Sequence, residues 1–324
     1  MHGPVTGQLF AVIYPVLAVI GIPGNLAVIS VLSWGRCGLS KCITCYLVGM
    51  ATSDLLVLVF AVVLNRIQSL YFPNSFLSIS PSCRINVALV YVGTDSSVWL
   101  TTAFTFDRYI AICCGALSVR YCQARTARLV AISVYTFFGL KNILWYFALE
   151  PEKIVNNVPW FCVLTLRYYT TSHWIAFSWL NRVLTPCVPF LLILFFNVLT
   201  VRHILFANRV RARLRQGRMV DTERNNRQKS IVALFTISAG FFLLWSTYLA
   251  HMLYYRLTRT FSYSPGTGES AYLLQEMGFL LLLVSSSTNT CLYTFTQSKF
   301  KQELRNALLC PLRLSGRLLN ARLG

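Results

Sequence analysis

Charged residues are scarce in this sequence of 324 residues. Only 12% of the residues are charged, whereas 56% are hydrophobic, and the 10 acidic residues are far fewer than the 29 basic ones. A soluble domain carries about twice that charged fraction. The composition therefore argues against an ordinary soluble fold and favours a chain that lies in lipid.

Clustered catalytic side chains are missing as well. The four histidines, His2, His173, His203 and His251, are scattered along the chain, and no group of His, Asp or Ser falls together in an apolar segment. The sequence also lacks the internal repeats that are typical of transporters. We therefore expect neither an enzyme nor a transporter, and no metal site or cofactor apart from the sodium ion considered below. A non-signalling or constitutively active scaffold protein is an alternative.

Apolar residues are present instead in blocks long enough to cross a bilayer, for which a helix needs about 20 residues. These blocks predict an all-α membrane protein of one domain, a seven-transmembrane helix bundle with spans at about 8–32, 43–65, 86–113, 129–149, 174–201, 230–255 and 271–295. An amphipathic stretch at about 298–309 predicts a short interfacial helix on the membrane lipid. Cys310 closes this stretch and is a candidate for lipidation.

Lys and Arg are unevenly divided between the two sets of connections. Six lie in one set and 19 in the other. Because cytoplasmic loops carry the excess of basic residues, we expect a multi-pass plasma-membrane protein with an extracellular N-terminus and a cytoplasmic C-terminus. The net charge of +19 then indicates attraction to anionic lipid or an acidic partner rather than nucleic-acid binding. No cleavable leader is expected, because no basic n-region precedes the first span.

The third predicted span is long, and its inner end carries a triplet with two charged residues. A helix over residues 83–108 is about 37 Å long, enough to cross the bilayer core. Asp95 lies near its middle, and Asp107, Arg108 and Tyr109 close its inner end. Such a helix is suited to transmit a signal from one side of the membrane to the other.

Two cysteines fall in the predicted outer segments, where oxidation is favoured. Cys83 opens the third span, and Cys162 lies in the long outer loop at about 150–173. We hypothesise that they form a disulfide, which would tether this loop to the third span.

A polar core is expected inside the bundle. Asn25, Asp54, Ser97 and Asn289 are polar side chains within predicted spans, and such residues face the bundle interior. A hydrated sodium ion near Asp54, or a protonated Asp54 bonded to Asn289, would both suit this core. A purely structural hydrogen bond is the plainer alternative.

These residues resemble the rhodopsin-like (class A) G-protein-coupled receptors along nearly the whole chain. The motifs that carry the resemblance lie in the expected spans and order: Gly24-Asn25, Asp54, Cys83 with Cys162, Asp107-Arg108-Tyr109, Pro189, Phe241 with Trp245, and Asn289 four residues before Tyr293. Within the family, the chain looks most similar to the orphan receptors that respond to aromatic amino acids, with FMRFamide-type peptide receptors as neighbours.

The chain departs from the family pattern at several positions. Ser246 stands where the family has the proline of the sixth span, Thr290 replaces the proline of the seventh, and Tyr135 replaces the tryptophan of the fourth. Val90 stands at the position of the amine-binding aspartate, which argues against a biogenic amine as ligand. Without these prolines, we expect weaker kinks in the sixth and seventh spans than the family pattern implies.

The resemblance implies a heterotrimeric G protein as partner, with the Gq class as one candidate. It implies a switch at the inner mouth and a packing relay above it. Arg108 is expected to face the inner mouth without a packing role, and a simple buried aromatic pair is the alternative for the relay. The residues implied are, for the switch, Asp107, Arg108, Tyr109, Asn289 and Tyr293, and for the relay, Phe241 and Trp245.

An outward-opening ligand cavity is expected between the third, fifth, sixth and seventh spans. Three charges at similar depth, Asp95, Lys141 and Arg182, should pair in low dielectric. If Asp95 and Arg182 are incompletely paired, Arg182 would take a ligand carboxylate and Asp95 its ammonium, which suits an amino acid or a peptide end. A structural ion pair is the alternative. The candidate ligand-binding residues are Tyr91, Thr94, Asp95, Arg182, Tyr248, His251, Met252 and Phe279.

Overall fold

The computed structural model describes residues 4–34, 38–213, 231–232, 235–250, 269–296 and 300–306. The first part of the chain forms three long helical segments. They comprise α1 (Pro4–Ser33), then α2 (Lys41–Val57) continued by η1 (Leu58–Ile67) and α3 (Gln68–Tyr71), and then α4 (Ser80–Cys113), which follows the short turn η2 (Phe76–Ser78).

The second part adds further long helices and a small outer loop built of strands. Its elements are α5 (Gly115–Tyr121), α6 (Ala124–Asn142), α7 (Leu144–Ala148), β1 (Leu149–Glu150), β2 (Lys153–Val155), β3 (Val158–Trp160), β4 (Val163–Leu164), α8 (Leu166–Thr170), α9 (Ser172–Arg182), η3 (Val183–Cys187), α10 (Val188–Arg213), the helix Phe235–Ala250 and α12 (Glu269–Thr296). Residues 300–306 are also helical.

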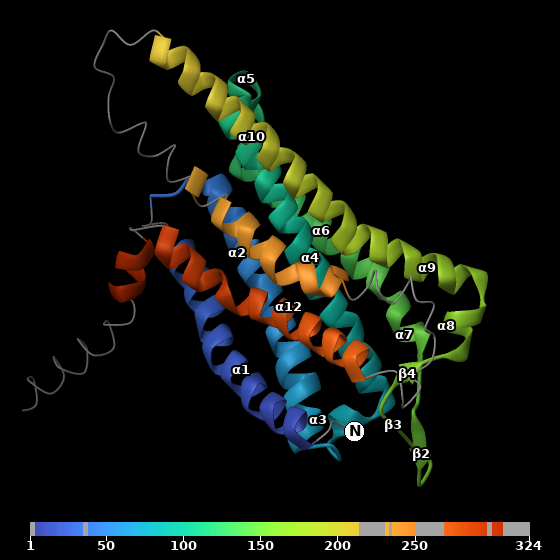
Figure 1. The fold of residues 1–324 in the computed structure, drawn as a ribbon. Coiled ribbons are helices and arrows are strands. Elements are labelled where there is room, and N and C mark those ends of the chain that lie inside the picture. Colours follow the sequence, from blue (N-terminus) through green and yellow to red (C-terminus); the bar gives the residue numbers. More distant parts are fainter. Residues whose placement is uncertain are drawn as a thin grey trace, which may run out of the picture.

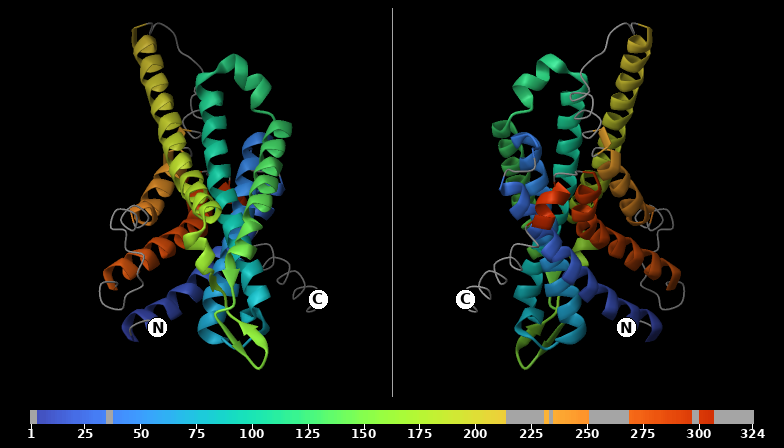
Figure 2. Two further views of the ribbon diagram at one scale, coloured as in Figure 1. Left: turned by 90° about the vertical axis from the view of Figure 1, so that its right-hand side faces the viewer. Right: turned by 90° about the vertical axis from the view of Figure 1, so that its left-hand side faces the viewer.

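The helices pack side by side around α4, which contacts α2, α6 and α10 (Figure 1). The start of the described chain and the β2–β3 hairpin lie at one end of the bundle, and α5 and the far end of α10 lie at the other (Figure 2). We call these the outer and inner ends, following the orientation expected from sequence. This arrangement fits the predicted seven-transmembrane bundle.

Four described helical segments are both long and apolar enough to cross a membrane by composition alone: Leu9–Ser33, Lys41–Tyr71, Ala124–Ala148 and Ser172–Ala207. Phe235–Ala250 and Glu276–Thr288 are shorter apolar helices. The central helix α4 is more polar, and its buried face includes Asp95, Thr101 and Asp107. Neighbouring helices supply hydrogen-bond partners for these polar side chains, because lipid tails cannot form hydrogen bonds.

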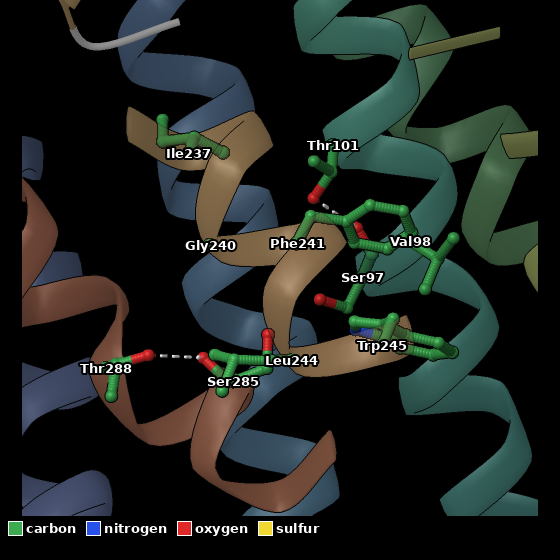
Figure 3. A pocket seen from close by; sticks show the side chains of 10 residues that line it. All are labelled: Ser97, Val98, Thr101, Ile237, Gly240, Phe241, Leu244, Trp245, Ser285 and Thr288. Atoms are coloured by element: carbon green, nitrogen blue, oxygen red, sulfur yellow. Dashed lines mark hydrogen bonds between the residues drawn. The ribbon is translucent and has the colours of Figure 1, made fainter. Parts of the chain in front are cut away.

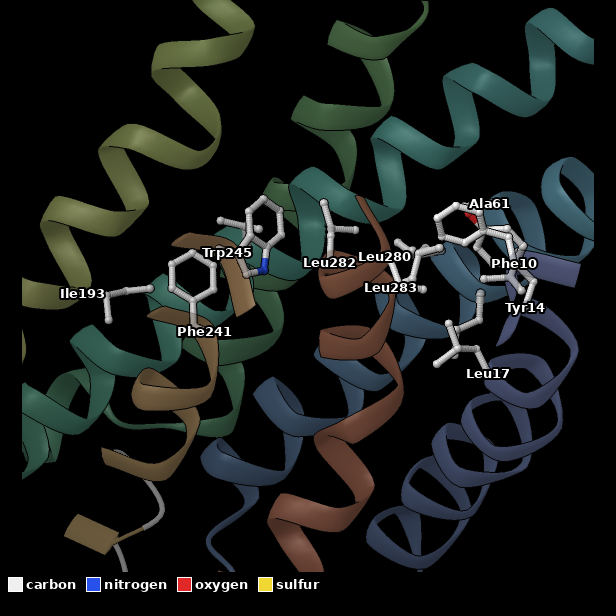
Figure 4. Close-up of a cluster of buried hydrophobic side chains, with 14 residues drawn as sticks. Phe10, Tyr14, Leu17, Ala61, Ile193, Phe241, Trp245, Leu280, Leu282 and Leu283 are labelled. Atoms are coloured by element: carbon white, nitrogen blue, oxygen red, sulfur yellow. The ribbon is translucent and has the colours of Figure 1, made fainter. Parts of the chain in front are cut away.

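Three hydrophobic clusters lie among the described residues, and the two larger ones lie toward opposite ends of the bundle. The inner cluster joins α1, α2 and α4 through side chains such as Tyr46, Met50 and Phe104, and Phe300 of the last helical segment is fully buried in it. The outer cluster runs from α1 across α12 to the helix Phe235–Ala250 (Figure 4). The two clusters leave a polar layer between them, which Asp54 and Ser97 share.

Interhelical hydrogen bonds fix the relative positions of the helices. The Asn25 amide donates to the Ser286 carbonyl at 2.9 Å and ties α1 to α12. The Tyr135 hydroxyl lies 2.7 Å from both the Ser53 hydroxyl and the Gly49 carbonyl, so it ties α6 to α2. Tyr135 therefore supplies the contact at the position where the family resemblance led us to expect a tryptophan.

The fifth span is interrupted at η3. Thr185 has an extended backbone (φ −146°, ψ 112°), as is usual for a residue before proline, here Pro186. The backbone N–H of Val188 donates to the Val183 carbonyl, five residues earlier, rather than to the Leu184 carbonyl. The Leu184 carbonyl accepts instead from the Trp99 indole N–H at 3.1 Å, which joins α4 to the fifth span.

The outer loop is a small, pinned hairpin. Strands β2 and β3 pair antiparallel, and Asn156 and Asn157 turn the chain with positive φ values of 53° and 59°, a conformation that Asn tolerates well. The expected disulfide between Cys83 and Cys162 is present, with Cα atoms 6.0 Å apart. It attaches the loop to the start of α4.

Replacing Trp99 by phenylalanine should lower the melting temperature of the purified protein. An aromatic ring is retained, but the partly buried Leu184 carbonyl loses its donor, which costs about 1 kcal/mol and corresponds to roughly 2–4 °C. Trp34→Phe, at the exposed end of α1, is the matched control. Equal shifts for the two variants would show that the indole bond contributes nothing specific.

Candidate functional site

A cavity of about 590 Å³ opens between α4, the fifth span, the helix Phe235–Ala250 and α12. Six of the eight ligand-binding residues predicted from sequence line it, namely Tyr91, Thr94, Asp95, Arg182, Tyr248 and Phe279. The other two, His251 and Met252, lie outside the described residues. The volume is typical of pockets for small ligands.

A buried ion pair lies at the edge of this cavity, which Asp95 lines. The Lys141 ammonium lies 2.6 Å from Asp95 Oδ2 and 2.6 Å from Asn181 Oδ1. The Asn142 amide donates to the same Asp95 oxygen at 2.8 Å. The side chains of Lys141 and Asp95 are only 7% and 4% exposed. The ion pair therefore joins the third, fourth and fifth spans.

This network corrects the pairing considered from sequence. Asp95, Lys141 and Arg182 were all expected to pair, with an Asp95–Arg182 ion pair as the structural alternative, and in the structure Asp95 pairs with Lys141. Nη1 of Arg182 is buried and has no hydrogen-bond partner among the described residues. Because Arg182 lines the cavity, its guanidinium is the group left to meet a ligand.

A second charged pair lies at the opposite end of the same cavity. The Arg66 guanidinium is 3.2 Å from the Glu276 carboxylate and lies over the Tyr14 and Phe279 rings. Tyr14 donates a long hydrogen bond, 3.5 Å, to Glu276. Arg66 and Glu276 lie at the ends of two spans, which is a signal that the sequence offers, but the sequence does not show that they pair.

An aromatic wall completes the cavity. The Tyr91 and Trp145 rings stack with centroids 4.1 Å apart and planes 4° apart, and Tyr168 tilts against Trp145 at 5.8 Å. The Trp145 indole nitrogen is buried and has no hydrogen-bond partner among the described residues. Sequence reasoning missed Trp145 and Tyr168, because residues far apart in the chain carry no local pattern that joins them.

The polar core lies inward of this cavity. The Ser97 hydroxyl donates to Asp54 Oδ1 at 2.7 Å. Beside it, a cavity of about 20 Å³ lies between Ser97, Trp245 and Ser285 (Figure 3), which is room for about one water molecule. Asn289 belongs to α12, but its side chain lies outside the described part, so its predicted bond to Asp54 stays a prediction.

The predicted relay residues are in contact. The Phe241 and Trp245 ring centroids are 5.4 Å apart, and Trp245 meets Tyr248 edge-on at 5.9 Å. Figure 4 shows Phe241 and Trp245 side by side, with Ile193 of α10 next to them. Trp245 lines both the large and the small cavity, so this aromatic column runs from the outer cavity to the polar core.

The residues of the predicted inner switch are arranged around Asp107. Its carboxylate pairs with the neighbouring Arg108 and accepts from the Cys42 thiol at 3.1 Å. The Cys122 thiol contacts the Asp107 carbonyl at 3.6 Å, and burial and Asp107 raise the pKa of Cys122 to about 12, so it stays a protonated donor. These groups hold Asp107 in a fully enclosed setting.

Arg108 differs from its predicted setting. It was expected to face the inner mouth without packing, yet it is 6% exposed and its guanidinium lies over the Phe104 ring at 5.9 Å. The enclosed Asp107 carboxylate turns the Arg108 head inward. Tyr109 instead points toward α10 and stacks on Phe196 at 5.6 Å.

Two predicted groups fall outside the described side chains. The side chain of Tyr293 and the whole of Cys310 are not part of the described structure, so their switch and lipidation roles stay predictions. The expected interfacial helix at about 298–309 is described over residues 300–306. Phe300 anchors this segment to the inner hydrophobic cluster.

The chain matches the model of the 7 transmembrane receptor (rhodopsin family) over residues 24–293. It is 26% identical to the thyrotropin-releasing hormone receptor of Gallus gallus, an alignment that covers 91% of this chain and 77% of that receptor. It is 24% identical to the C-C chemokine receptor type 1 of Macaca fascicularis over 93% of this chain and 79% of the relative. The expected kinship with aromatic-amino-acid and FMRFamide receptors finds no support in these relatives.

The family match covers most of the chain and includes all the motif residues from Asn25 to Tyr293. It confirms the seven-transmembrane helix bundle, and it agrees with the expectation of a receptor rather than an enzyme. The apolar helices and the family together make the chain a multi-pass membrane protein. The chain belongs to the rhodopsin family of seven-transmembrane receptors.

Proposed function

We propose that the chain is a receptor that binds an extracellular ligand with a free carboxylate, an amino-acid-like molecule or a peptide end, and activates a heterotrimeric G protein. The observation that carries the proposal is the Arg182 guanidinium, which lines the 590 Å³ cavity with Nη1 unpartnered among the described residues. A guanidinium binds a carboxylate through two parallel hydrogen bonds.

The charge balance around the cavity supports an anionic group rather than a cation. Arg66 is offset by Glu276, and Asp95 is offset by Lys141. Arg182 leaves one positive charge in excess among these described side chains. Asp95 is therefore not required as a receptor for a ligand ammonium, which revises the role considered from sequence.

The relatives support a peptide as one form of this ligand. Their names identify a hormone receptor and a chemokine receptor. The cavity is large enough for a small molecule or for the end of a peptide, and the pinned outer hairpin lies at the same end of the bundle. An amino-acid-like ligand and a peptide end share the carboxylate that Arg182 would read.

The residues between the cavity and the inner end of the bundle support the proposal that the receptor activates a G protein. α4 carries Asp95 at the cavity and Asp107 at the inner switch, twelve residues or about 18 Å apart along one helix. Trp245 and Phe241 lie between the cavity and the polar core. A Gq-class partner, an extracellular N-terminus and a cytoplasmic C-terminus are further parts of the proposal.

Three accompanying proposals concern small partners. A sodium ion beside Asp54 and Ser97 suits their oxygen atoms, which are hard ligands. Anionic lipid is proposed to contact the basic residues at the inner end, and Cys310 is proposed to carry a lipid chain. Measuring ligand affinity at increasing sodium concentrations tests the first proposal. An affinity that does not change with sodium concentration would contradict it.

Arg182→Gln should lower the potency of acidic ligands at least tenfold while leaving surface expression near that of the unmodified receptor. The assay is a second-messenger screen of free amino acids and short peptides, each compared with its carboxyl-amidated form. Arg167→Gln, which removes an exposed charge near the outer mouth, is the control. Undiminished potency of the acids in Arg182→Gln would refute the ligand-reading role.

Arg108→Ala should abolish ligand-stimulated nucleotide exchange on the G protein. The substitution removes the guanidinium that the resemblance assigns to the G-protein contact, and it leaves Asp107 with the thiol of Cys42 as a partner. Surface expression is measured in parallel, since a buried arginine also contributes to packing. Normal exchange at normal expression would contradict the assignment.

A further inference from the structure

Lys141 does not line the outer cavity, yet it contacts two residues that do, Asp95 and Asn181. The Lys141 ammonium donates hydrogen bonds to Asp95 and to Asn181, and Asn181 directly precedes Arg182 in α9. Asn181 is held in turn through its amide, which donates to the Phe177 carbonyl at 2.9 Å. Lys141 therefore connects the cavity carboxylate to the helix segment that presents the guanidinium.

We propose that Lys141 is a positioning residue that sets the charge preference of the cavity by occupying Asp95 and leaving Arg182 free for an acidic ligand. The inference rests on the proposed function and adds to it the residue that determines the specificity. Without Lys141, Asp95 would be the one unneutralised carboxylate beside Arg182 among the described residues, and the two would pair.

The chemistry of the two cations favours this division. A lysine ammonium is a compact charge with three donors, and in Lys141 two of them are directed at Asp95 and Asn181. The planar fork of an arginine matches a carboxylate through two bonds. In the structure, Asp95 thus pairs with Lys141, and Arg182 remains available for a carboxylate of the ligand.

Burial makes the arrangement sensitive to a single charge. Asp95 is 3% exposed and Asn142, its second donor, is fully buried. In such surroundings a charge pair interacts several times more strongly than in water. Removing or adding one charge at this position therefore changes how strongly the cavity attracts an anion.

Substitutions that lower and that raise the net charge beside the cavity should change the preference for an acidic ligand in opposite directions. Lys141→Met lowers the net charge beside the cavity by one and frees Asp95 to compete for Arg182. Asp95→Asn raises the net charge by one and leaves Lys141 available as a second cation. The double variant returns the net charge to its original value. A role in packing alone would not produce opposite effects from the two single variants.

The experiment uses two probes that differ by one charge, N-acetylphenylalanine and its uncharged carboxamide. Their aromatic ring suits the Tyr91–Trp145 wall. Their dissociation constants are measured by the melting temperature of the purified full-length receptor during titration, and the readout is the ratio of acid affinity to amide affinity. Lys153→Met, an exposed lysine of the outer hairpin, is the matched control.

We expect the unmodified receptor and Lys153→Met to prefer the acid, and Arg182→Gln to lose that preference. Lys141→Met should lower the acid-to-amide ratio about tenfold, Asp95→Asn should raise it, and the double variant should return near the original ratio. If the unmodified receptor shows no preference for the acid, the proposed function fails, and the inference fails with it. If Arg182→Gln behaves as expected but Lys141→Met keeps the ratio, the inference alone is overturned.

Discussion

The structure depends on how it accommodates a carboxylate buried in an apolar bundle. Asp95 lies on the central helix, and its charge is stable there only with close donors around it. Lys141 and Asn142 of α6 supply them, and Lys141 also reaches Asn181 of α9. Satisfying one carboxylate thus fixes the relative positions of three spans, and it determines that Arg182 is the cation left facing the cavity.

A second buried carboxylate with close hydrogen-bonding partners lies at the inner end of α4. Asp107 is again an enclosed carboxylate, and it draws in Arg108 and the Cys42 thiol as partners. One helix therefore carries two buried carboxylates whose partners come from different neighbours. α4 contacts α2, α6 and α10, so both carboxylates lie on the element that joins these helices.

The sequence predicts the fold well, because long apolar blocks and charge asymmetry are direct consequences of a bilayer. The disulfide and six of the eight cavity residues were also predicted, since outer cysteines and polar residues at membrane depth are rare enough to stand out. The sequence predicted that Asp95, Lys141 and Arg182 pair, but it did not select which of the two cations is the partner of Asp95. Lys141 and Arg182 are both within reach by sequence, and only the rotation of each helix and the rotamer of each side chain select between them.

An experimental structure of the receptor in lipid nanodiscs, solved without added ligand, tests this account most directly. The account predicts that the Lys141 ammonium lies within hydrogen-bonding distance of both Asp95 and Asn181, and that the Arg182 guanidinium faces the cavity without a protein carboxylate beside it. A map in which Asp95 pairs with Arg182, while Lys141 turns away from the bundle, would contradict it.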